Sequence, residues 1–525
     1  MTINLNKASS RYFGVAQSLT GAAVNEELII SRSVVLTGEN DALKTQNGLW
    51  CFMDALRLLV RVVGRLTICI PPGFPELEAE ARKCCLDTYL RGEPQFVTDL
   101  TSSLQQADAI LNVGFSVSSS HPWTAISSNG WIARVSSGSI PLPKEMGQPN
   151  PIAALFAASL GVTEVFKRIY GVPASVAPLL DKVELSLFEN STEFDSAGPL
   201  LPDNIALPDT LLDGGGAIGN GIALLMTQLP VVGRLHIVDK QDYQDENHGT
   251  SILLEKSDWI RKPKAEQLAK WITQNSTLHA TGEKAFINDA LSSETVKSMC
   301  VELVLNGLDD VQARHDSQLA WPSIIVDGGI NETGAAVIQH RLDNRGLACL
   351  ICAFKLPTHD PRDNQRQLTG LDSSALTDQG RLLTEQDIID ADPDKQTWLR
   401  EMLREKRTIC SVVSEAGLHR LGVIAEDGFK PSVPFVATAA AAMVVAEALK
   451  ALLFPDRRYS QRFTIGNLFL GSQTLANSSR SADLSCVCVR HRSLIHSLLP
   501  RRKHNLTSKT NSSFGHTTEG VGARN

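Results

Sequence analysis

An internal duplication is the feature that most constrains how this 525-residue chain can fold. Residues 434–450 read PFVATAAAAMVVAEALK and residues 151–167 read PIAALFAASLGVTEVFK, so both segments share a leading proline, several alanines and a closing E-x-x-K. Ahead of each helix, GRLTI at Gly64–Ile68 matches GRLHI at Gly233–Ile237, and both open β-branched runs typical of buried parallel strands. Because the two pairs occur in the same order, we infer two related copies in one chain.

Each copy begins with a strand of its own, at Ser33–Thr37 and at Thr210–Leu212, and then alternates strands with helices. This alternation predicts an α/β fold made of two tandem Rossmann-like, doubly wound domains. Between its matched strand and its matched helix, the second copy carries more than a hundred extra residues, and we expect additional chemistry there.

Composition narrows the class of protein. With 43% hydrophobic and 20% charged residues, the chain has the composition of a globular protein, and its net charge of −7 gives no electrostatic reason to expect nucleic acid or a membrane as partner. The N-terminus, Met1–Arg11, shows no secretory signal, so we expect a cytoplasmic protein. In that compartment the ten cysteines are expected to be core residues, metal ligands or nucleophiles and not disulfides.

A glycine-rich turn follows the first strand of the second copy. Gly214, Gly216 and Gly219 form G-x-G-x-x-G, in which the glycines permit a tight turn, approach of a phosphate and close packing of helix on strand. The next strand ends at Asp239, twenty residues after Gly219, where a carboxylate can hold a ribose hydroxyl. The pattern predicts a nucleotide site and suits a dinucleotide as well as ATP.

Two residues further along favour ATP over the cofactor of an oxidoreductase. Lys264 begins a predicted helix and can neutralise a triphosphate, and Asp309 follows a predicted strand and can hold Mg²⁺. Adenylation needs both groups, because the lysine and the metal stabilise charge as pyrophosphate leaves. Hydride transfer needs neither, although a lysine or aspartate at the end of an element is often simply solvated.

With these residues in place, the chain from about 205 to 490 resembles the ThiF/MoeB/ubiquitin-activating superfamily. The resemblance rests on the glycine loop, Asp239, Asn247, Lys264 and the stretch Asp309–Arg314, which is similar to the family's Asp-Asn-x-x-x-Arg. It implies that Asp239 and Asn247 contact the ribose and the neighbouring phosphate, that Lys264 contacts the phosphates, and that Asp309 binds magnesium.

Four positions depart from the family pattern. Gln241 replaces a second acidic residue, Asp310 replaces an asparagine, and His248 replaces an apolar residue. Thr250 stands where the family has a phosphate-binding arginine, which leaves a non-catalytic nucleotide-binding scaffold as an alternative.

The first copy lacks the features of a nucleotide site. Its turn, Thr37–Asp41, has no glycine loop, and Ile70 occupies the place of Asp239, so we expect no nucleotide there. In this superfamily active sites form between two related domains, which implies that the first copy is an inactive partner. Arg11 is a candidate for an arginine that it supplies to the phosphates, with a solvent-exposed arginine as the alternative.

Four cysteines occur in two close pairs. Cys349 and Cys352 form C-x-x-C, and Cys486 and Cys488 form C-x-C far downstream. Two such pairs can close a tetrahedral Zn²⁺ site that joins the C-terminal segment to the domain. The family usually has two C-x-x-C pairs at similar places, and the second pair here is one residue shorter. Buried or redox-active cysteines remain the alternative.

Cys410 stands apart from these pairs and matches the position of the family's reactive cysteine. A thiolate at this position would displace AMP from an acyl adenylate and form a thioester, and Lys406 and Arg407 nearby would favour the thiolate. A small buried core residue is the alternative.

The resemblance also implies a division of the chain and a function. We expect ATP-dependent adenylation of the C-terminal carboxylate of a ubiquitin-like β-grasp protein, a thioester on Cys410, and transfer to a conjugating enzyme, as in bacterial ubiquitination-like systems associated with phage defence. A sulfur-carrier-protein adenylyltransferase of the thiamine or molybdenum cofactor type is the alternative, and a homodimer is possible. The predicted parts are an inactive adenylation-like domain (1–190), a linker (191–208), an active adenylation domain (209–345 and 430–498), an insertion with the zinc-type C-x-x-C and the cysteine loop (346–429), and a disordered tail (501–525).

Overall fold

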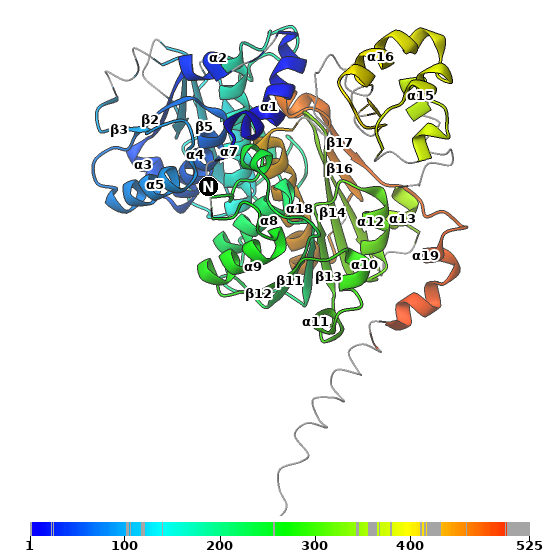
Figure 1. The fold of residues 1–525 in the computed structure, drawn as a ribbon. Coiled ribbons are helices and arrows are strands. Elements are labelled where there is room, and N and C mark those ends of the chain that lie inside the picture. The colour runs from blue at the N-terminus through cyan, green and yellow to red at the C-terminus, as the bar shows by residue number, and fades with distance from the viewer. Residues whose placement is uncertain are drawn as a thin grey trace, which may run out of the picture.

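The protein consists of two α/β units that pack side by side, and a smaller helical part projects from the second (Figure 1). The computed structural model describes residues 3–22, 24, 26–100, 104, 107–116, 121–138, 140–255, 258–342, 346–354, 365–366, 368–377, 381–409, 412–413, 416, 432–457, 459–498 and 500.

The two main sheets repeat one topology. The first has the strand order β3-β2-β1-β4-β5-β6-β7 and the second β12-β11-β9-β13-β14-β15-β16-β17. In both sheets the first five strands are parallel and the following strands antiparallel. The predicted fold of two tandem Rossmann-like domains is therefore confirmed. The strands of the first sheet are β1 (Ser33–Gly38), β2 (Arg65–Cys69), β3 (Gln95–Val97), β4 (Ala109–Val113), β5 (Trp123–Asn129), β6 (Ile132–Ser136) and β7 (Val183–Ser186); those of the second are β9 (Thr210–Asp213), β11 (Arg234–Val238), β12 (His279–Glu283), β13 (Leu303–Asn306), β14 (Ile324–Ile330), β15 (Ala335–Arg341), β16 (Arg462–Ile465) and β17 (Leu475–Ser478).

Helices from the two copies form a shared core. The duplicated segments are the helices α7 (Pro151–Tyr170) and α18 (Pro434–Leu453), each of which starts with a proline, where no helical hydrogen bond is lost. They pack against each other: the Ser159 and Thr438 hydroxyls lie 2.8 Å apart, and the ring centroids of Phe166 and Phe435 lie 5.3 Å apart. One hydrophobic cluster runs through both copies, so neither copy has a separate main core.

The remaining described helices of the two copies lie around these sheets and the shared core. They are α1 (Leu5–Thr20), α2 (Glu26–Ser31), α3 (Asn40–Leu43), α4 (Gln46–Val62), α5 (Pro75–Thr88), α8 (Ala217–Gln228), α9 (Lys264–Asn275), α10 (Ile287–Ala290), α11 (Glu294–Lys297), α12 (Val311–Gln318), α13 (Leu350–Ala353) and α19 (Val487–Arg490), with the 3-10 turns η1 (Asp245–Gly249) and η4 (Leu468–Thr474).

Helix α18 is long and apolar enough to cross a membrane, yet 89% of its most apolar window is buried inside the protein. Its closing E-x-x-K forms a buried ion pair, with 2.6 Å between Glu447 and Lys450, and the equivalent pair in α7, Glu164 and Lys167, lies 2.5 Å apart. A core helix at the junction of the two copies accounts for this apolar sequence.

The segment predicted as a linker is packed against both copies. Within it, β8 (Ile205–Ala206) pairs with β10 (Val231–Val232) of the second copy. The Trp131 indole of the first copy donates to the Pro199 carbonyl at 2.9 Å. These contacts give the segment a defined path between the copies.

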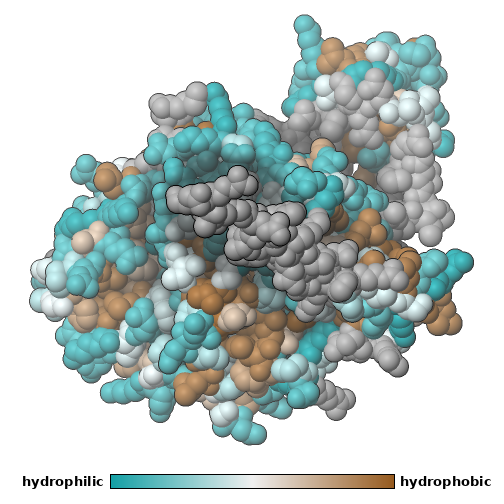
Figure 2. Space-filling model, turned by 90° about the horizontal axis from the view of Figure 1, so that it is seen from below, coloured by the Kyte–Doolittle hydropathy of each residue, from teal (hydrophilic) through white to brown (hydrophobic). Residues whose placement is uncertain are grey.

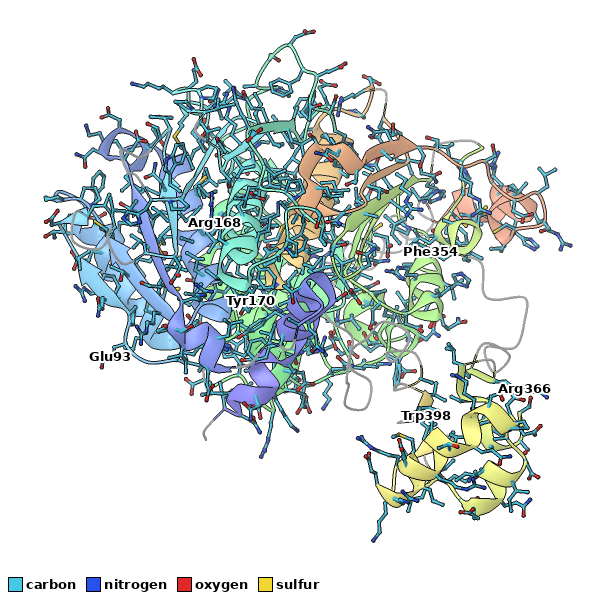
Figure 3. All side chains as sticks on the ribbon, turned by 90° about the horizontal axis from the view of Figure 1, so that it is seen from above. Glu93, Arg168, Tyr170, Phe354, Arg366 and Trp398 are labelled. Atoms are coloured by element: carbon cyan, nitrogen blue, oxygen red, sulfur yellow. The ribbon has the colours of Figure 1, made fainter. Side chains whose placement is uncertain are left out.

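The projecting helical part carries a core of its own. It comprises η2 (Ala375–Thr377), α15 (Glu385–Ile389), η3 (Pro393–Lys395) and α16 (Gln396–Arg404), whose apolar residues form a separate cluster around Leu399 and Ile388. It stands off the body at the upper right of Figure 2, and Figure 3 shows Trp398 and Arg366 on it, apart from Phe354 on the body. This part falls within the predicted insertion.

A buried carboxyl at the junction of the copies predicts a pH effect on stability. Asp54 is fully buried and accepts from the Gln228 amide at 2.8 Å, and burial raises its pKa to about 7, opposed by Arg57 and reinforced by Glu80. The folded protein therefore holds a proton that the unfolded chain releases near pH 4. We expect the free energy of unfolding to fall by up to about 4 kcal/mol between about pH 4 and pH 7 on this account.

Chemical unfolding at several pH values tests this expectation. Asp54→Asn should flatten the pH profile, whereas Asp41→Asn, at an exposed carboxyl, should leave it unchanged. A profile of equal slope in Asp54→Asn and wild type would contradict the assignment.

Candidate nucleotide-binding site

Each of the three glycines of the loop lies in a different structural setting. Gly214 follows β9 with a φ of +96°, which favours glycine, and a Cβ on it would lie 2.9 Å from the Gly307 carbonyl oxygen. A Cβ on Gly219 would lie 2.1 Å from the Gly214 carbonyl oxygen, so this glycine allows the turn to close onto helix α8. A Cβ on Gly216 would meet no atom within 4 Å, and this open space lies at the N-terminus of α8. A helix N-terminus with open space beside it suits a phosphate group.

Asp239 holds the loop to the neighbouring strand. It follows β11, and its two carboxylate oxygens accept from the main-chain N–H groups of Gly215 and Gln241, each at 2.7 Å. The carboxylate thus lies at the mouth of the glycine turn, partly exposed, where the carboxyl ends of parallel strands meet.

Lys264 brings a buried positive charge to the same place. It is the first residue of α9 and is only 4% exposed, and its ammonium group donates to the Gln241 side-chain oxygen at 2.7 Å. Burial lowers the pKa of Lys264, whereas the charges of Asp239 and Asp309 raise it. A Cβ on Gly215 would lie 3.1 Å from the Lys264 Cβ, so lysine and loop are in close contact.

Arg11 reaches this site from the first copy. It lies on α1, which packs against η1 of the second copy. Burial lowers its pKa, and the charges of Glu246 and Asp309 oppose that shift, which places all three groups within electrostatic range. Arg11 and Lys264 also interact with each other. Arg11 is therefore within electrostatic range of Lys264 and Asp309, and its role toward a phosphate stays a prediction.

Asn247 and Thr250 shape the turn beside the loop. The buried Asn247 side chain accepts from the Gln244 N–H at 2.9 Å, and its carbonyl accepts from the Thr250 hydroxyl at 3.3 Å. Thr250 is 2% exposed and brings no charge, whereas Lys264 and Arg11 bring positive charges close to this turn.

A buried polar cluster lies next to the glycine loop, and the sequence did not predict it. Asp213, Asn306 and Asp327 are registered neighbours on β9, β13 and β14, and the Ser317 hydroxyl lies 2.5 Å from Asp213 and 2.8 Å from Asn306. Arg314 binds both oxygens of Asp327 at 3.0 Å. Burial raises the pKa of Asp213 to about 6. The available signal was a polar residue at the end of the apolar strands β9 and β13, and another in the middle of β14.

Glu39 occupies the equivalent turn in the first copy. By strand register Thr37 corresponds to Asp213 and Asn112 to Asn306, so Glu39 stands in the place of Gly215. Its carboxylate accepts from the N–H groups of Phe115 and Ser116 at 2.7 and 2.8 Å. The Glu39 side chain thus binds main-chain donors at a position where the second copy has a glycine, and the inactivity of the first copy stays a prediction.

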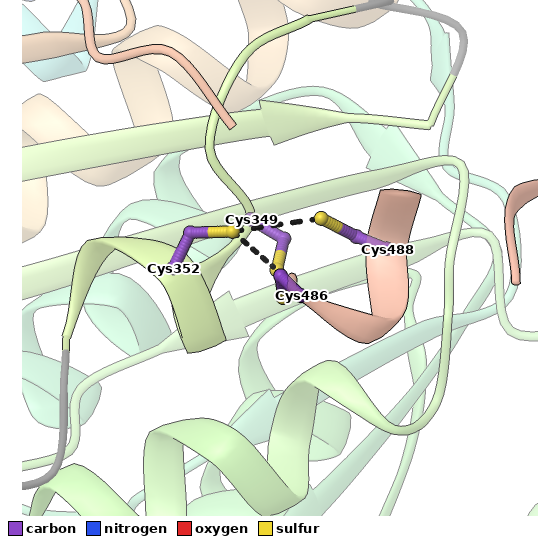
Figure 4. A group of neighbouring side chains, drawn as sticks. All are labelled: Cys349, Cys352, Cys486 and Cys488. Carbon is purple, nitrogen blue, oxygen red and sulfur yellow. Dashed lines mark hydrogen bonds between the residues drawn. The ribbon is translucent and has the colours of Figure 1, made fainter. Parts of the chain in front are cut away.

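The two cysteine pairs converge on one point (Figure 4). Cys349 and Cys352 flank the start of α13, and Cys486 and Cys488 flank the start of α19; all four sulfurs lie within 4.8 Å of one another. The shorter Sγ–Sγ distances are 3.5 and 3.8 Å. A tetrahedral zinc with bonds of about 2.3 Å requires sulfurs about 3.8 Å apart, whereas a disulfide requires about 2.05 Å. The thiol set therefore fits zinc.

Cys410, the predicted nucleophile, lies outside the described residues. So do the residues from 417 to 431 of the same predicted loop and the predicted tail from 501 to 525. Of the neighbouring residues that the structure describes, Lys406 and Arg407 follow helix α16. Ile409 packs into the core of the projecting helical part.

The two sheets and the helices that cover them define a protein of the doubly wound α/β class. Residues 194–486 match the model of the ThiF family. The match covers more than half of the chain, which therefore belongs to the ThiF family.

Individual proteins show more distant similarity. The uncharacterized protein y4jF of Sinorhizobium fredii (strain NBRC 101917 / NGR234) is 28% identical over 253 residues, which are 46% of this chain and 45% of that protein. The chain thus spans less than half the length of this curated relative. Among solved structures, E. coli MccB with ATP is similar at 14% identity over 54% of this chain and 67% of MccB, with a TM-score of 0.34. MccB with MccA-N7isoASN is similar at 15% identity over 54% of this chain and 66% of that chain, with a TM-score of 0.34.

Proposed function

We propose that the chain is an ATP-dependent activating enzyme for a ubiquitin-like β-grasp protein. The observation that carries the proposal is the convergence of an open glycine loop, Asp239, Lys264, Asp309 and Arg11 at one sheet edge. Two cations beside a helix N-terminus suit a triphosphate better than the diphosphate of NAD.

Each group of the site has a role in adenylation. Asp239 and Asn247 would hold the ribose and the adjoining phosphate, Lys264 and Arg11 would bind phosphate oxygens, and Asp309 would hold Mg²⁺. The metal would neutralise charge on the phosphates. A cation from the first copy also compensates for the uncharged Thr250, which argues against the reading of the chain as a non-catalytic scaffold.

The proposed reaction has two steps. An oxygen of the carrier's C-terminal carboxylate attacks the α-phosphorus of ATP, forming an acyl adenylate and releasing pyrophosphate. The Cys410 thiolate then attacks the acyl carbon, forming a thioester and releasing AMP. A conjugating enzyme would accept the acyl group, and the four-cysteine site would hold a structural zinc.

ATP–pyrophosphate exchange by the purified chain with Mg²⁺ tests the proposal. Exchange should require a β-grasp carrier with an intact C-terminus. Exchange with a ubiquitin-like carrier but not with a thiamine- or molybdenum-type sulfur carrier would support the ubiquitin-like substrate, and the opposite preference would support the sulfur-carrier alternative. ATP binding without exchange for any carrier would favour a scaffold, and preference for NAD would overturn the proposal.

Cys410→Ala is expected to separate the two steps. Because the thiol acts after pyrophosphate has left, the variant should keep exchange close to the wild-type rate and lose the carrier thioester, seen as a thiol-sensitive band on non-reducing gels. Cys300→Ala, at a buried cysteine outside the four-cysteine cluster, serves as the control. A thioester that survives in Cys410→Ala would place the nucleophile elsewhere.

A further inference from the structure

The turn that carries Asn247 is held by the first copy. Residues 244–254, which we call the clamped segment, belong to the second copy and include η1. A Cβ on Gly249 would lie 2.2 Å from the Ala8 carbonyl oxygen of α1, so the two backbones touch there. The His248 Nε2 lies 2.8 Å from the Thr88 carbonyl oxygen at the end of α5. His248, which departs from the family pattern, therefore contacts the first copy.

Arg61 makes the main contact. It lies at the end of α4 in the first copy and is fully buried. Its Nε donates to the Ser251 carbonyl at 2.9 Å, and its Nη2 donates to the carbonyls of Ile252 and Leu254 at 2.7 and 3.1 Å. One rigid, planar guanidinium therefore fixes the direction of three carbonyl groups within four residues.

These carbonyls directly follow the turn that positions Asn247. The Asn247 carbonyl accepts from the N–H groups of Thr250 and Ser251 at 3.1 and 2.8 Å, so a shift at Ser251 moves the turn. The buried guanidinium is costly to desolvate, and its three hydrogen bonds to carbonyls offset part of that cost. The contact thus links the first copy to the side of the site where the ribose is expected.

We propose that Arg61 is a positioning residue: the first copy clamps residues 244–254 so that Asn247 faces the nucleotide. The proposal rests on the proposed function for its kinetic consequence. Loosening the clamp misplaces a group that binds ATP without removing the cations that stabilise departing pyrophosphate. We therefore expect KM for ATP to rise by about 10- to 100-fold while kcat changes little.

Arg61→Met tests the clamp, because methionine fills a similar volume and donates no hydrogen bond. Arg168→Met is the matched control: Arg168, labelled in Figure 3, donates to the Trp123 and Ser137 carbonyls at 3.1 and 2.9 Å within the first copy. Only Arg61→Met should raise KM for ATP in pyrophosphate exchange and increase deuterium uptake in peptides covering 244–254. Arg61→Lys, which keeps a donor, should recover part of both effects.

The possible results distinguish loss of the clamp from a general loss of stability and from failure of the proposed function. An unchanged KM and unchanged uptake in Arg61→Met, or equal effects in Arg168→Met, would overturn the clamp. If Arg61→Met fails to fold, His248→Ala removes the Thr88 contact from the other side and should show the same two effects more weakly. If the wild-type chain shows no exchange with any carrier, the proposed function fails, and deuterium uptake still decides whether Arg61 clamps the segment.

Discussion

Replacing Lys264 by alanine is expected to reduce ATP–pyrophosphate exchange by about 100-fold or more, the effect of removing a preorganised charge from a buried site. The ammonium group is nearly buried, begins α9 and adjoins Gly215 of the glycine loop. Water cannot take over the role of the lysine charge, because the surrounding residues exclude water from this position. Loss of the lysine should therefore slow the departure of pyrophosphate.

Lys262→Ala is the matched control for this effect. Lys262 lies two residues earlier and is exposed, so its removal changes the net charge equally without touching the loop. Exchange by Lys262→Ala should stay near the wild-type rate. A Lys264→Ala protein that unfolds at the wild-type temperature yet exchanges within a few-fold of wild type would show that phosphate binding depends on other groups.

Replacing Cys349 by serine is expected to remove bound zinc and release the C-terminal segment. The cluster joins α13 to α19 across more than 130 residues of sequence, and structural zinc contributes on the order of 10 kcal/mol in small domains. We expect about one zinc per wild-type chain by elemental analysis, none in Cys349→Ser, and a lower unfolding temperature with faster proteolysis near α19.

Cys300→Ser provides the comparison, because Cys300 is buried but lies outside the cluster. It should retain zinc. A wild-type chain that lacks zinc after expression with zinc supplied, or a Cys349→Ser chain that keeps it, would contradict a four-thiolate metal site.

The architecture could be predicted because its signals are local and repeated. Glycine spacing, strand-ending polar residues and the two alanine-rich helices each depend on neighbours in sequence, and the duplication allowed each copy to be compared with the other. The convergence of Cys349 with Cys486 followed from the known behaviour of paired thiols. These patterns survive in one sequence because each is set by backbone geometry or ligand chemistry.

The contacts between copies could not be predicted in the same way. Arg61 and Ser251 are 190 positions apart, and a single buried arginine in an apolar helix gives no indication of its acceptors. Glu39 in a non-glycine turn showed that the first copy lacks the loop but not that its carboxylate binds Phe115 and Ser116. Packing of the segment from 191 to 208 was likewise hidden, since its composition is that of an exposed connection.

Because the two copies are fused in one chain, the same position can carry different residues in the two halves. In a dimer of identical chains every residue must serve in both halves, so an arginine that suits one half is imposed on the other. Counting back from the matched Gly64 and Gly233, the position of Arg61 is taken by Pro230 in the second copy. There the main chain binds β8 through the Pro230 carbonyl, which accepts from the Ile205 N–H at 2.8 Å. Corresponding positions of the two copies thus carry two different tasks, a specialisation that a dimer of identical chains does not allow.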